Sequence, residues 1–245
     1  EEENSAESKR RRRMLDLNRD AARFFHTCLK APEGRAAQAY MNARQITPQT
    51  ATRFGLGAAP DTWDRLRNAM HELGYRDQEL FEAGLVRKGK SGGFYDTFRG
   101  RLMFPVIDVR GSVIGFSGRI LGDGEPKYLN SPETPVFSKS HNLFGLNLAK
   151  KSKNGYIILV EGNMDVVSLD QAGFDGAVAS LGTSLTGEQA RLISRYTNEV
   201  ILCYDSDEAG QNATVRALTI ARDTGAVVKV IIVPDGKDPD EYIRK

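Results

Sequence analysis

Hydrophobic positions follow different patterns in the two halves of the chain. Up to about residue 94, apolar residues recur at helical spacing in segments that end near glycine or proline. Beyond Tyr156, short β-branched runs alternate with longer amphipathic segments, which gives four strands joined by three helices. This alternation is typical of a parallel sheet flanked by helices. We therefore predict an α/β protein in which a basic α+β region precedes a parallel sheet.

The first half divides into helices and then a β-hairpin. The hairpin strands are expected over 102–107 and 113–116, around the turn Asp108–Gly111, with a polar loop from 122 to 135. The expected helices cover Met14 to about Lys30, Arg35 to about Ala43, a short segment from Pro48, Asp61–Leu73 and Asp77–Ala83. The predicted divisions are a flexible basic tail over 1–13, an α+β subdomain over 14–152 and the parallel-sheet subdomain over 153–245.

Carboxylates follow three of the apolar runs in the second half. The runs are 156–160, 200–204 and 227–233, and each reads as a strand whose carboxyl end lies at one edge of the sheet. No histidine or cysteine accompanies the acids, which favours a hard cation such as Mg²⁺ or Mn²⁺. The acids are Glu161 and Asp165, Asp205 and Asp207, and Asp238 and Asp240.

The same acids have a structural alternative, because a carboxylate just after a strand often caps the next helix. Asp165, four residues after Glu161, falls on the first turn of a helix and either caps it or orients Glu161. Asp205 and Asp207 are two apart, so their side chains share one face of an extended segment. Two metals held by such a set can activate a 3′-hydroxyl and stabilise leaving pyrophosphate. Recurrence at successive strand ends favours the functional alternative.

Charge is divided unevenly along the chain. Residues 1–154 hold 26 Lys and Arg against 18 Asp and Glu, a difference of +8, whereas 155–245 hold 8 against 14, a difference of −6. A basic half joined to an acidic half suits a polyanion held by one part while metals act from the other, although a solvated basic surface would give the same count. Part of the excess lies in Lys9–Arg13.

Composition excludes several other classes. No run of 18 apolar residues and no signal-peptide pattern occurs, so neither a membrane span nor a membrane partner is expected. Cys28 and Cys203 lie far apart in apolar segments and are predicted to be buried free thiols, as in a reducing cytoplasm. The three histidines and two cysteines lack the spacing of a zinc site. A first residue of Glu, not Met, suggests a processed chain or a fragment.

The motifs together resemble a known family. Glu-Gly-x-x-Asp at 161–165 followed by Asp-x-Asp at 205–207 is similar to the signature of the Toprim fold. Three segments of the first half resemble conserved segments of the bacterial replicative DNA primases: 99–108, 115–119 and 126–134. The segment 204–210, which contains the second motif, resembles them as well. The resemblance covers roughly residues 15–245 and implies a catalytic RNA-polymerase core that makes short RNA primers on single-stranded DNA from ribonucleoside triphosphates.

Residue roles follow from this resemblance. It implies that Glu161, Asp205 and Asp207 are catalytic metal ligands, with Asp238 and Asp240 near the metals. Two or more Mg²⁺ or Mn²⁺ ions are implied, only weakly bound without nucleotide because triphosphates bring their own Mg²⁺. Residues implied to bind template and nucleotide are Arg53, Arg119, Lys127, Tyr128 and Asn130. Nucleotide is expected in the cleft between the two halves. Asn163 departs from the family, where a Tyr is common.

Partners and location also follow from the resemblance. The implied partners are the single-stranded DNA template, ribonucleoside triphosphates and the RNA–DNA primer duplex, at a cytoplasmic replication fork. Replicative helicase and single-strand-binding protein would be reached through modules not seen in this sequence. The family's zinc-binding module is likewise not seen, and the final helical part of the core is expected to be cut short at Lys245.

Each basic residue has a simpler alternative. Lys127 and Tyr128 can contact phosphate and stack on a base, or can be a solvated lysine beside a core tyrosine. Arg119 could be a surface residue of an edge strand, and Phe94, Tyr95 and Phe98 are expected in the core. The loop 180–184 could hold phosphate through backbone N–H groups. Rival functions are a Toprim nuclease or topoisomerase, and a single-strand-binding module without catalysis.

Overall fold

The computed structural model describes residues 2–234 and 236–245, which form two compact units. The first unit comprises the chain up to Val106 together with Ser112–Ser138. The second comprises Ile107–Gly111 and Lys139–Lys245. The division therefore falls earlier than the expected 152/153 boundary, because residues 139–149 pack into the second unit: Leu143, Leu146 and Ala149 belong to its core.

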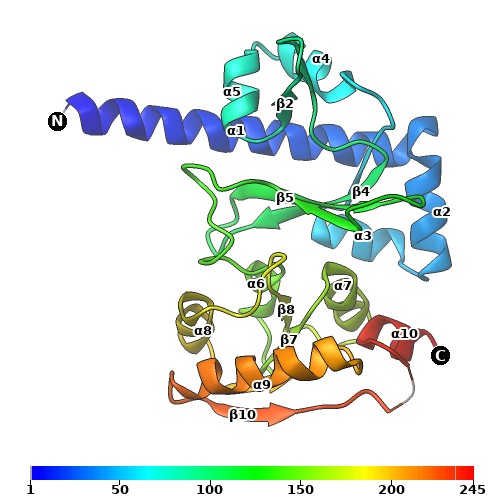
Figure 1. The fold of residues 1–245 in the computed structure, drawn as a ribbon, viewed down its shortest axis with the longest axis vertical. Coiled ribbons are helices and arrows are strands. Elements are labelled where there is room, and N and C mark those ends of the chain that lie inside the picture. The colour runs from blue at the N-terminus through cyan, green and yellow to red at the C-terminus, as the bar shows by residue number, and fades with distance from the viewer. Residues whose placement is uncertain (1, 235) are drawn as a thin grey trace. The chain divides into compact units, whose positions relative to one another are not determined.

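Helices and a four-stranded sheet make up the first unit (Figure 1). The sheet order is β1–β4–β5–β6, with antiparallel pairing of β1 to β4 and of β5 to β6, and β2 pairs with β3 separately. The helices are α1 (Glu2–Lys30), a 3₁₀ turn η1 (Pro32–Gly34), α2 (Arg35–Ala43), α3 (Pro48–Phe54), α4 (Arg65–Glu72) and α5 (Asp77–Glu82). The strands are β1 (Gly57–Ala59), β2 (Val86–Lys88), β3 (Phe94–Asp96), β4 (Arg101–Ile107), β5 (Val113–Ile120) and β6 (Tyr128–Asn130).

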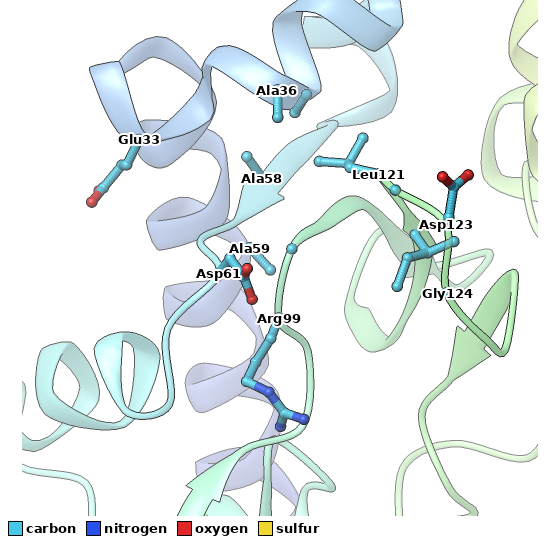
Figure 2. Close-up of a pocket in the computed structure, with 13 residues that line it drawn as sticks. Glu33, Ala36, Ala58, Ala59, Asp61, Arg99, Leu121, Asp123 and Gly124 are labelled. Carbon is cyan, nitrogen blue, oxygen red and sulfur yellow. The ribbon is translucent and has the colours of Figure 1, made fainter.

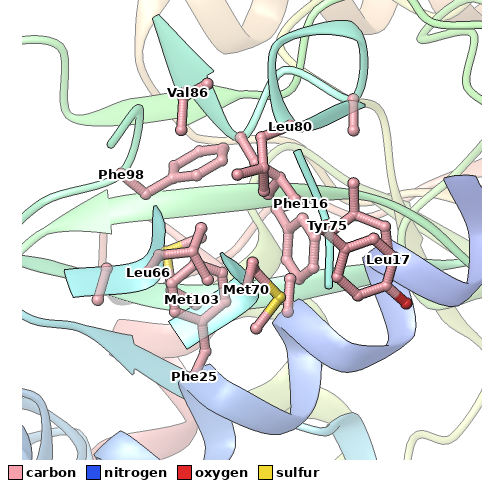
Figure 3. Close-up of a cluster of buried hydrophobic side chains, with 14 of the residues drawn as sticks. Leu17, Phe25, Leu66, Met70, Tyr75, Leu80, Val86, Phe98, Met103 and Phe116 are labelled. Atoms are coloured by element: carbon pink, nitrogen blue, oxygen red, sulfur yellow. The ribbon is translucent and has the colours of Figure 1, made fainter. Parts of the chain in front are cut away.

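An aromatic cluster forms the core of this unit (Figure 3). Phe25 of α1 meets Phe98 and Phe116 edge to face, at ring-centroid distances of 6.5 Å and 5.4 Å. Leu17 and Met70 complete it from α1 and α4, so the apolar stripe expected from Met14 onward does bury against the sheet. Phe98 is buried as predicted, whereas Phe94 and Tyr95 are only partly buried.

Residues 2–13 differ from the sequence-based expectation of a flexible tail over 1–13, of which residue 1 lies outside the described residues. The helix α1 begins at Glu2 and is continuous through this basic segment. Two ion pairs connect it to α5, from Arg10 to Glu82 at 2.8 Å and from Arg13 to Glu79 at 2.8 Å. Arg13 also lies 4.2 Å from the centre of the Tyr75 ring. Arginine and glutamate are good helix formers, so the charges that suggested disorder are compatible with a helix.

The second unit is the predicted parallel sheet with helices. Its strand order is β10–β9–β7–β8, all parallel. The strands are β7 (Ile157–Val160), β8 (Ala177–Ala179), β9 (Glu199–Leu202) and β10 (Val227–Val230). The helices are α6 (Leu146–Ala149), α7 (Asn163–Gln171), α8 (Gly187–Ser194), α9 (Glu208–Arg222) and α10 (Pro239–Arg244). Both cysteines are buried and free, as expected.

Helices cover both faces of this sheet. Ile157 and Leu159 of β7 pack with residues of α8 and α9, so Ile158 and Val160 face the other side, where α7 lies. The α7 connection runs from β7 to β8 and the α8 connection crosses back to β9, and right-handed crossovers in opposite directions place their helices on opposite faces. In the described part of the chain, no helix has both the length and the apolar character needed to cross a membrane.

Candidate active site

The acidic motifs meet where the strand order reverses. From β7 the chain proceeds to β8 on one side and then to β9 on the other, so the β7–β9 boundary is the switch point of the sheet. Glu161 follows β7 and Asp205 follows β9. The backbone N–H of Asp205 donates to Glu161 Oε1 at 3.1 Å, which joins the two loops. Ligands of open parallel sheets bind at such a point, outside the carboxyl ends of the strands.

Asp205 is held in an electrostatically unfavourable place. Its Oδ1 is buried and has no hydrogen-bond partner within the described structure. Burial raises its pKa to about 6, with further increases from the negative charges of Glu161, Asp238 and Asp207. Burial also raises the pKa of Glu161. A buried carboxylate oxygen without a donor is costly, and a divalent cation would relieve that cost. The residues present therefore fit a hard metal ion.

Asp207 and Asp238 both begin helices. Asp207 Oδ1 accepts from the N–H of Gly210 at 2.8 Å as the N-cap of α9, and Asp238 Oδ1 accepts from the N–H of Glu241 at 2.8 Å as that of α10. Each cap uses one carboxylate oxygen and leaves the other available to a further partner. For Asp207 that partner is Lys237, whose Nζ lies 3.7 Å from Oδ2. The capping alternative and the ligand role are thus compatible.

Asp165 and Asp240 lie deeper than the other acids. Asp165 accepts from the N–H of Gly162 at 3.2 Å and from the N–H of Asp240 at 3.0 Å. Burial raises the pKa of Asp165 to about 8. Asp240 is only 1% exposed, accepts from the Ser168 hydroxyl at 2.5 Å and pairs with Arg244 at 3.2 Å. These two carboxylates therefore fasten α10 to α7 and position the loop that carries Asp238.

The acids come together in the fold without forming a closed cage. Among the described residues, no group of three or more Asp, Glu, His or Cys side chains lies close enough to hold a metal ion. The charges of Glu161, Asp207 and Asp238 each raise the pKa of Asp205, which shows that these acids repel one another. Lys237 lies beside the acids and lowers that pKa. Sequence reasoning missed this lysine, since only the fold brings it near Asp207.

Candidate template-binding residues of the first unit cluster on β5 and β6. Arg119 is paired directly with Tyr128, and two residues along the strands Asn130 is paired with Ser117, so these side chains share one face. Arg119 Nη1 donates to the carbonyl of Ile120 at 2.8 Å, and its guanidinium lies 4.4 Å from the centre of the Tyr40 ring. Stacking of this kind leaves other guanidinium N–H groups to meet phosphate.

Arg53 and Lys127 are more exposed. Arg53 stands in the last turn of α3, and Lys127 lies in the loop just before β6. That loop is held by Arg101, a buried residue that sequence reasoning did not single out. Its Nη1 donates to the carbonyls of Gly118 at 3.0 Å and Pro126 at 2.9 Å. Arg101 therefore fixes the position of the loop and does not itself face solvent.

A cavity of about 320 Å³ opens in the first unit between η1, β1 and the turn after β5 (Figure 2). Its charged side chains are Glu33, Asp61, Arg99 and Asp123, so acids outnumber bases. Arg99 also lies 4.3 Å from the ring centre of Trp63, which is 65% exposed. An exposed indole can stack with a base. A single tryptophan in a polar stretch gave no sequence signal for this.

A second cavity, of about 350 Å³, lies in the second unit beside Glu161. It is bordered by the loop after β8, by Tyr204 and by one side of α9, and its single basic residue is Arg216. The cavity thus opens at the same edge of the sheet as the acids, on the face covered by α8 and α9.

Comparison with known families assigns both units. Residues 24–150 match the family described as the N-terminal domain of the DNA primase catalytic core, and residues 158–243 match the Toprim-like family. The chain belongs to the DNA primase catalytic-core family. Its second unit is a Toprim fold, and the predicted resemblance and fold class are confirmed. A Toprim fold implies binding of divalent metal.

Curated DNA primases are close in sequence to this catalytic core. The primase of Clostridium acetobutylicum is 50% identical over 234 residues, covering 95% of this chain and 39% of that protein. The primase of Escherichia coli K12 is 43% identical over 227 residues, covering 91% of this chain and 39% of that protein. The chain thus spans about two fifths of the length of these relatives.

Solved structures agree with the sequence relatives. A DnaG primase catalytic domain bound to single-stranded DNA superposes with a TM-score of 0.88 at 40% identity, covering 97% of this chain and 78% of that one. The RNA polymerase domain of Mycobacterium tuberculosis primase gives a TM-score of 0.88 at 36% identity, with 96% and 80% covered. The primase core and this chain therefore share one fold throughout.

Proposed function

We propose that this chain is the catalytic core of a DNA primase, which joins ribonucleoside triphosphates into short RNA primers on a single-stranded DNA template. The observation that carries the proposal is the pair Glu161 and Asp205 at the switch point of the Toprim sheet, with Asp205 Oδ1 buried and without a partner in the described structure. Membership of the primase catalytic-core family and the similarity to DnaG structures support it.

We propose that Glu161, Asp205 and Asp207 hold two or more Mg²⁺ or Mn²⁺ ions, with Asp238 beside them. Bound divalent ions would supply the charge that activates a 3′-hydroxyl and stabilises the leaving pyrophosphate. Each of these residues follows a strand end or begins a helix, so the backbone brings the carboxylates to one edge of the sheet. Asp240 would have to release Arg244 before it could join them.

The other residues around the acids would act by positioning. Asp165 fixes the Gly162 turn and the start of α10, which sets the places of Glu161 and Asp238. Lys237 offsets part of the acidic charge next to Asp207. The acids repel one another while no cation is present. Divalent ions that arrive with a triphosphate would remove this repulsion, so the carboxylates could move in to bind them.

On the first unit we propose that Arg53, Arg119, Lys127, Tyr128 and Asn130 bind the template strand and the incoming nucleotide. Arg119, Tyr128 and Asn130 share one sheet face, so cation, ring and amide are offered together. This is the combination that binds single strands: charge contacts the phosphates and the ring stacks on a base. The primer–template duplex would leave along the same basic face.

The direct test is a reaction that contains ribonucleotides, Mg²⁺ and a labelled single-stranded template. A primase extends RNA on the template, whereas a Toprim nuclease would shorten the template and a binding module would do neither. Glu161→Gln should abolish extension, because it removes a proposed ligand while keeping nearly the same shape. Asp223→Asn, at the far end of α9, is the matched control and should remain active. Template cutting without extension would reject the proposal.

A further inference from the structure

The cavity beside Glu161 in the second unit is not used by the proposed metal chemistry. Its walls are the loop after β8, the side chain of Tyr204 and the first part of α9, as far as Arg216. On α9 the cavity is bordered by Ala209, Ala213 and Arg216, which recur at helical spacing on one face. Two alanines leave open space, and the arginine places a cation at its end.

One wall of the cavity carries a buried hydroxyl, that of Ser180, without a hydrogen-bond partner among the described residues. The residue directly follows β8, is 8% exposed and borders the cavity, yet its hydroxyl has no partner within the described structure. A buried hydroxyl without a partner is destabilising, because it has given up its hydrogen bonds to water without replacing them. Burial of this kind is tolerated where a ligand supplies the missing hydrogen bond.

Backbone donors converge on the same place. In the structure as described, the N–H groups of Gly182, Thr183 and Ser184 donate to no other backbone group. Gly182 has φ of +71°, the left-handed conformation that lets successive N–H groups point into a common hollow. Such hollows bind oxyanions. The guanidinium of Arg216, which borders the cavity, has no ion pair with any described residue and would add charge and directed donors.

We propose that this cavity is a phosphate-binding subsite formed by Ser180, the N–H groups of 182–184 and Arg216. The phosphate belongs either to a nucleoside triphosphate or to the backbone of a nucleic-acid strand. This rests on the proposed function only for the source of the phosphate, since oxyanion binding itself needs no catalysis. The acidic side chains of the cavity in the first unit make that cavity the poorer candidate.

Glu161 sets the limits of the subsite. Its carboxylate borders the cavity, and Oε1 is engaged by the Asp205 N–H at the side of the proposed metals. A phosphate in the cavity would therefore lie next to the metal-binding acids without replacing them. Ser180 lies beside Glu161, because Val160 pairs with Ala179 in the sheet and each residue directly follows one member of that pair.

The test is an amide-resolved titration of the ¹⁵N-labelled protein in EDTA, first with tripolyphosphate and then with an unlabelled single strand that lacks terminal phosphate. Saturable shifts are expected at the amides of 182–184. Arg216→Gln should weaken the binding about tenfold and Ser180→Ala about threefold to fivefold. Arg222→Gln, also exposed and on α9, and Ser117→Ala, which likewise removes a buried unpaired hydroxyl, are the matched controls.

Every outcome of this titration decides the proposal. Shifts with tripolyphosphate alone assign the subsite to a triphosphate, and shifts with the strand alone assign it to a strand backbone. Ser180→Ala should weaken binding while leaving the unfolding temperature unchanged or raised, which a purely structural serine would not do. The proposed subsite would be overturned if neither probe shifted these amides. It would also be overturned if Arg216→Gln and Ser180→Ala both left the shifts unaltered. A protein that binds phosphate in this cavity but makes no primers would count against the proposed function and leave the subsite standing.

Discussion

The charged side chains at the acidic edge of the second unit and on the basic face of the first differ in how well their neighbours satisfy them. At the acidic edge, Asp205 has a buried oxygen without a partner in the described structure, and burial raises the pKa of Glu161. On the basic face, Arg119 is stacked on Tyr40 and bonded to a carbonyl, and beneath it the buried Arg101 fixes the loop before β6 through two carbonyls. Asp205 thus keeps an oxygen without a partner among the described residues, whereas Arg119 is already held in place by its neighbours.

This difference follows from the ligands that each region would take. A compact divalent ion can satisfy several carboxylates at once, so their repulsion before binding is offset in the bound state. A nucleic-acid strand is long and flexible, and rigid, already ordered cations lose less conformational freedom when it binds. We therefore expect that replacing an acid impairs catalysis far more than folding. Replacing a basic residue that is fixed by carbonyls should instead impair folding more than catalysis.

The largest expected effect is on catalysis at the acidic edge. Asp205→Asn should lower primer synthesis on the order of a thousandfold, because a neutral amide weakens binding of the divalent ion that supplies several kcal/mol of transition-state stabilisation. Dinucleotide formation and circular dichroism, measured on the same preparation, separate chemistry from folding. Asp207→Asn should behave alike, and full activity in that variant would remove Asp207 from the metal site. Asp223→Asn serves as the control.

A large effect on folding is expected for one cation. Arg101→Gln should lower the free energy of unfolding by about 2–3 kcal/mol, since the shorter amide cannot reach both the Gly118 and Pro126 carbonyls that the buried guanidinium satisfies. Denaturant unfolding measures the loss. Arg110→Gln, at an exposed turn, should change stability little. Equal stability of the two variants would show that Arg101 is not a structural residue.

Template binding should respond to the exposed cations. Arg53→Ala and Arg119→Ala should each weaken single-strand binding and reduce the slope of log affinity against log salt by about 0.7, the value expected per phosphate contact. Fluorescence anisotropy across a salt series, without nucleotide, gives both quantities. Lys127→Ala is expected to matter less if the lysine serves the triphosphate.

Two further variants sharpen that experiment. Asp207→Asn should leave the slope nearly unchanged, because the residue would contact metal and not template. Trp63→Ala should weaken binding without altering the slope, since stacking releases no counterions. If neither arginine variant changes affinity or slope, the template path lies elsewhere, and the basic stretch Lys9–Arg13 of α1 becomes the next segment to change.

The smallest predicted effect concerns stability and pH in the metal-free protein. Because the folded-state pKa of Asp205 is raised to about 6, its contribution to stability is full below about pH 4 and is lost as pH rises through 6. Asp205→Asn should therefore be more stable than the parent at pH 7, by about 1 kcal/mol after allowing for solvent screening. Unfolding in EDTA from pH 4 to 7 tests this, and a constant difference between the two proteins would contradict it.

The sequence revealed the strand ends because each acid follows a short apolar run, and burial of such runs in a parallel sheet depends mainly on local pattern. Glu161 and Asp205 meet as expected for that reason. The sequence did not reveal that Asp240 turns inward to Arg244 and Ser168, because that depends on how α10 packs on α7. Lys237 and Ser180 gain their neighbours in the same way, through loops that only the folded chain brings together.

Helix boundaries in the first unit were predictable where a local signal exists. Thr47 caps α3 through the N–H of Thr50, and Arg35–Ala43 is helical as expected. Residues 2–13 carried no apolar periodicity, so their helix depends on the length of α1 and on ion pairs to α5 that lie far away in sequence. Likewise, Arg101 occupies an ordinary strand position, and only the cross-strand carbonyls explain its burial.

The most direct test of the central claim is the location of divalent ions in crystals of the protein soaked with Mn²⁺ and a ribonucleoside triphosphate. Anomalous scattering identifies manganese without reference to the rest of the density. If these acids are the metal ligands, peaks are expected within ordinary oxygen-ligand distance, about 2.0–2.6 Å, of carboxylate oxygens of Glu161, Asp205 and Asp207. Manganese bound elsewhere, with those three carboxylates making no metal contact, would contradict it.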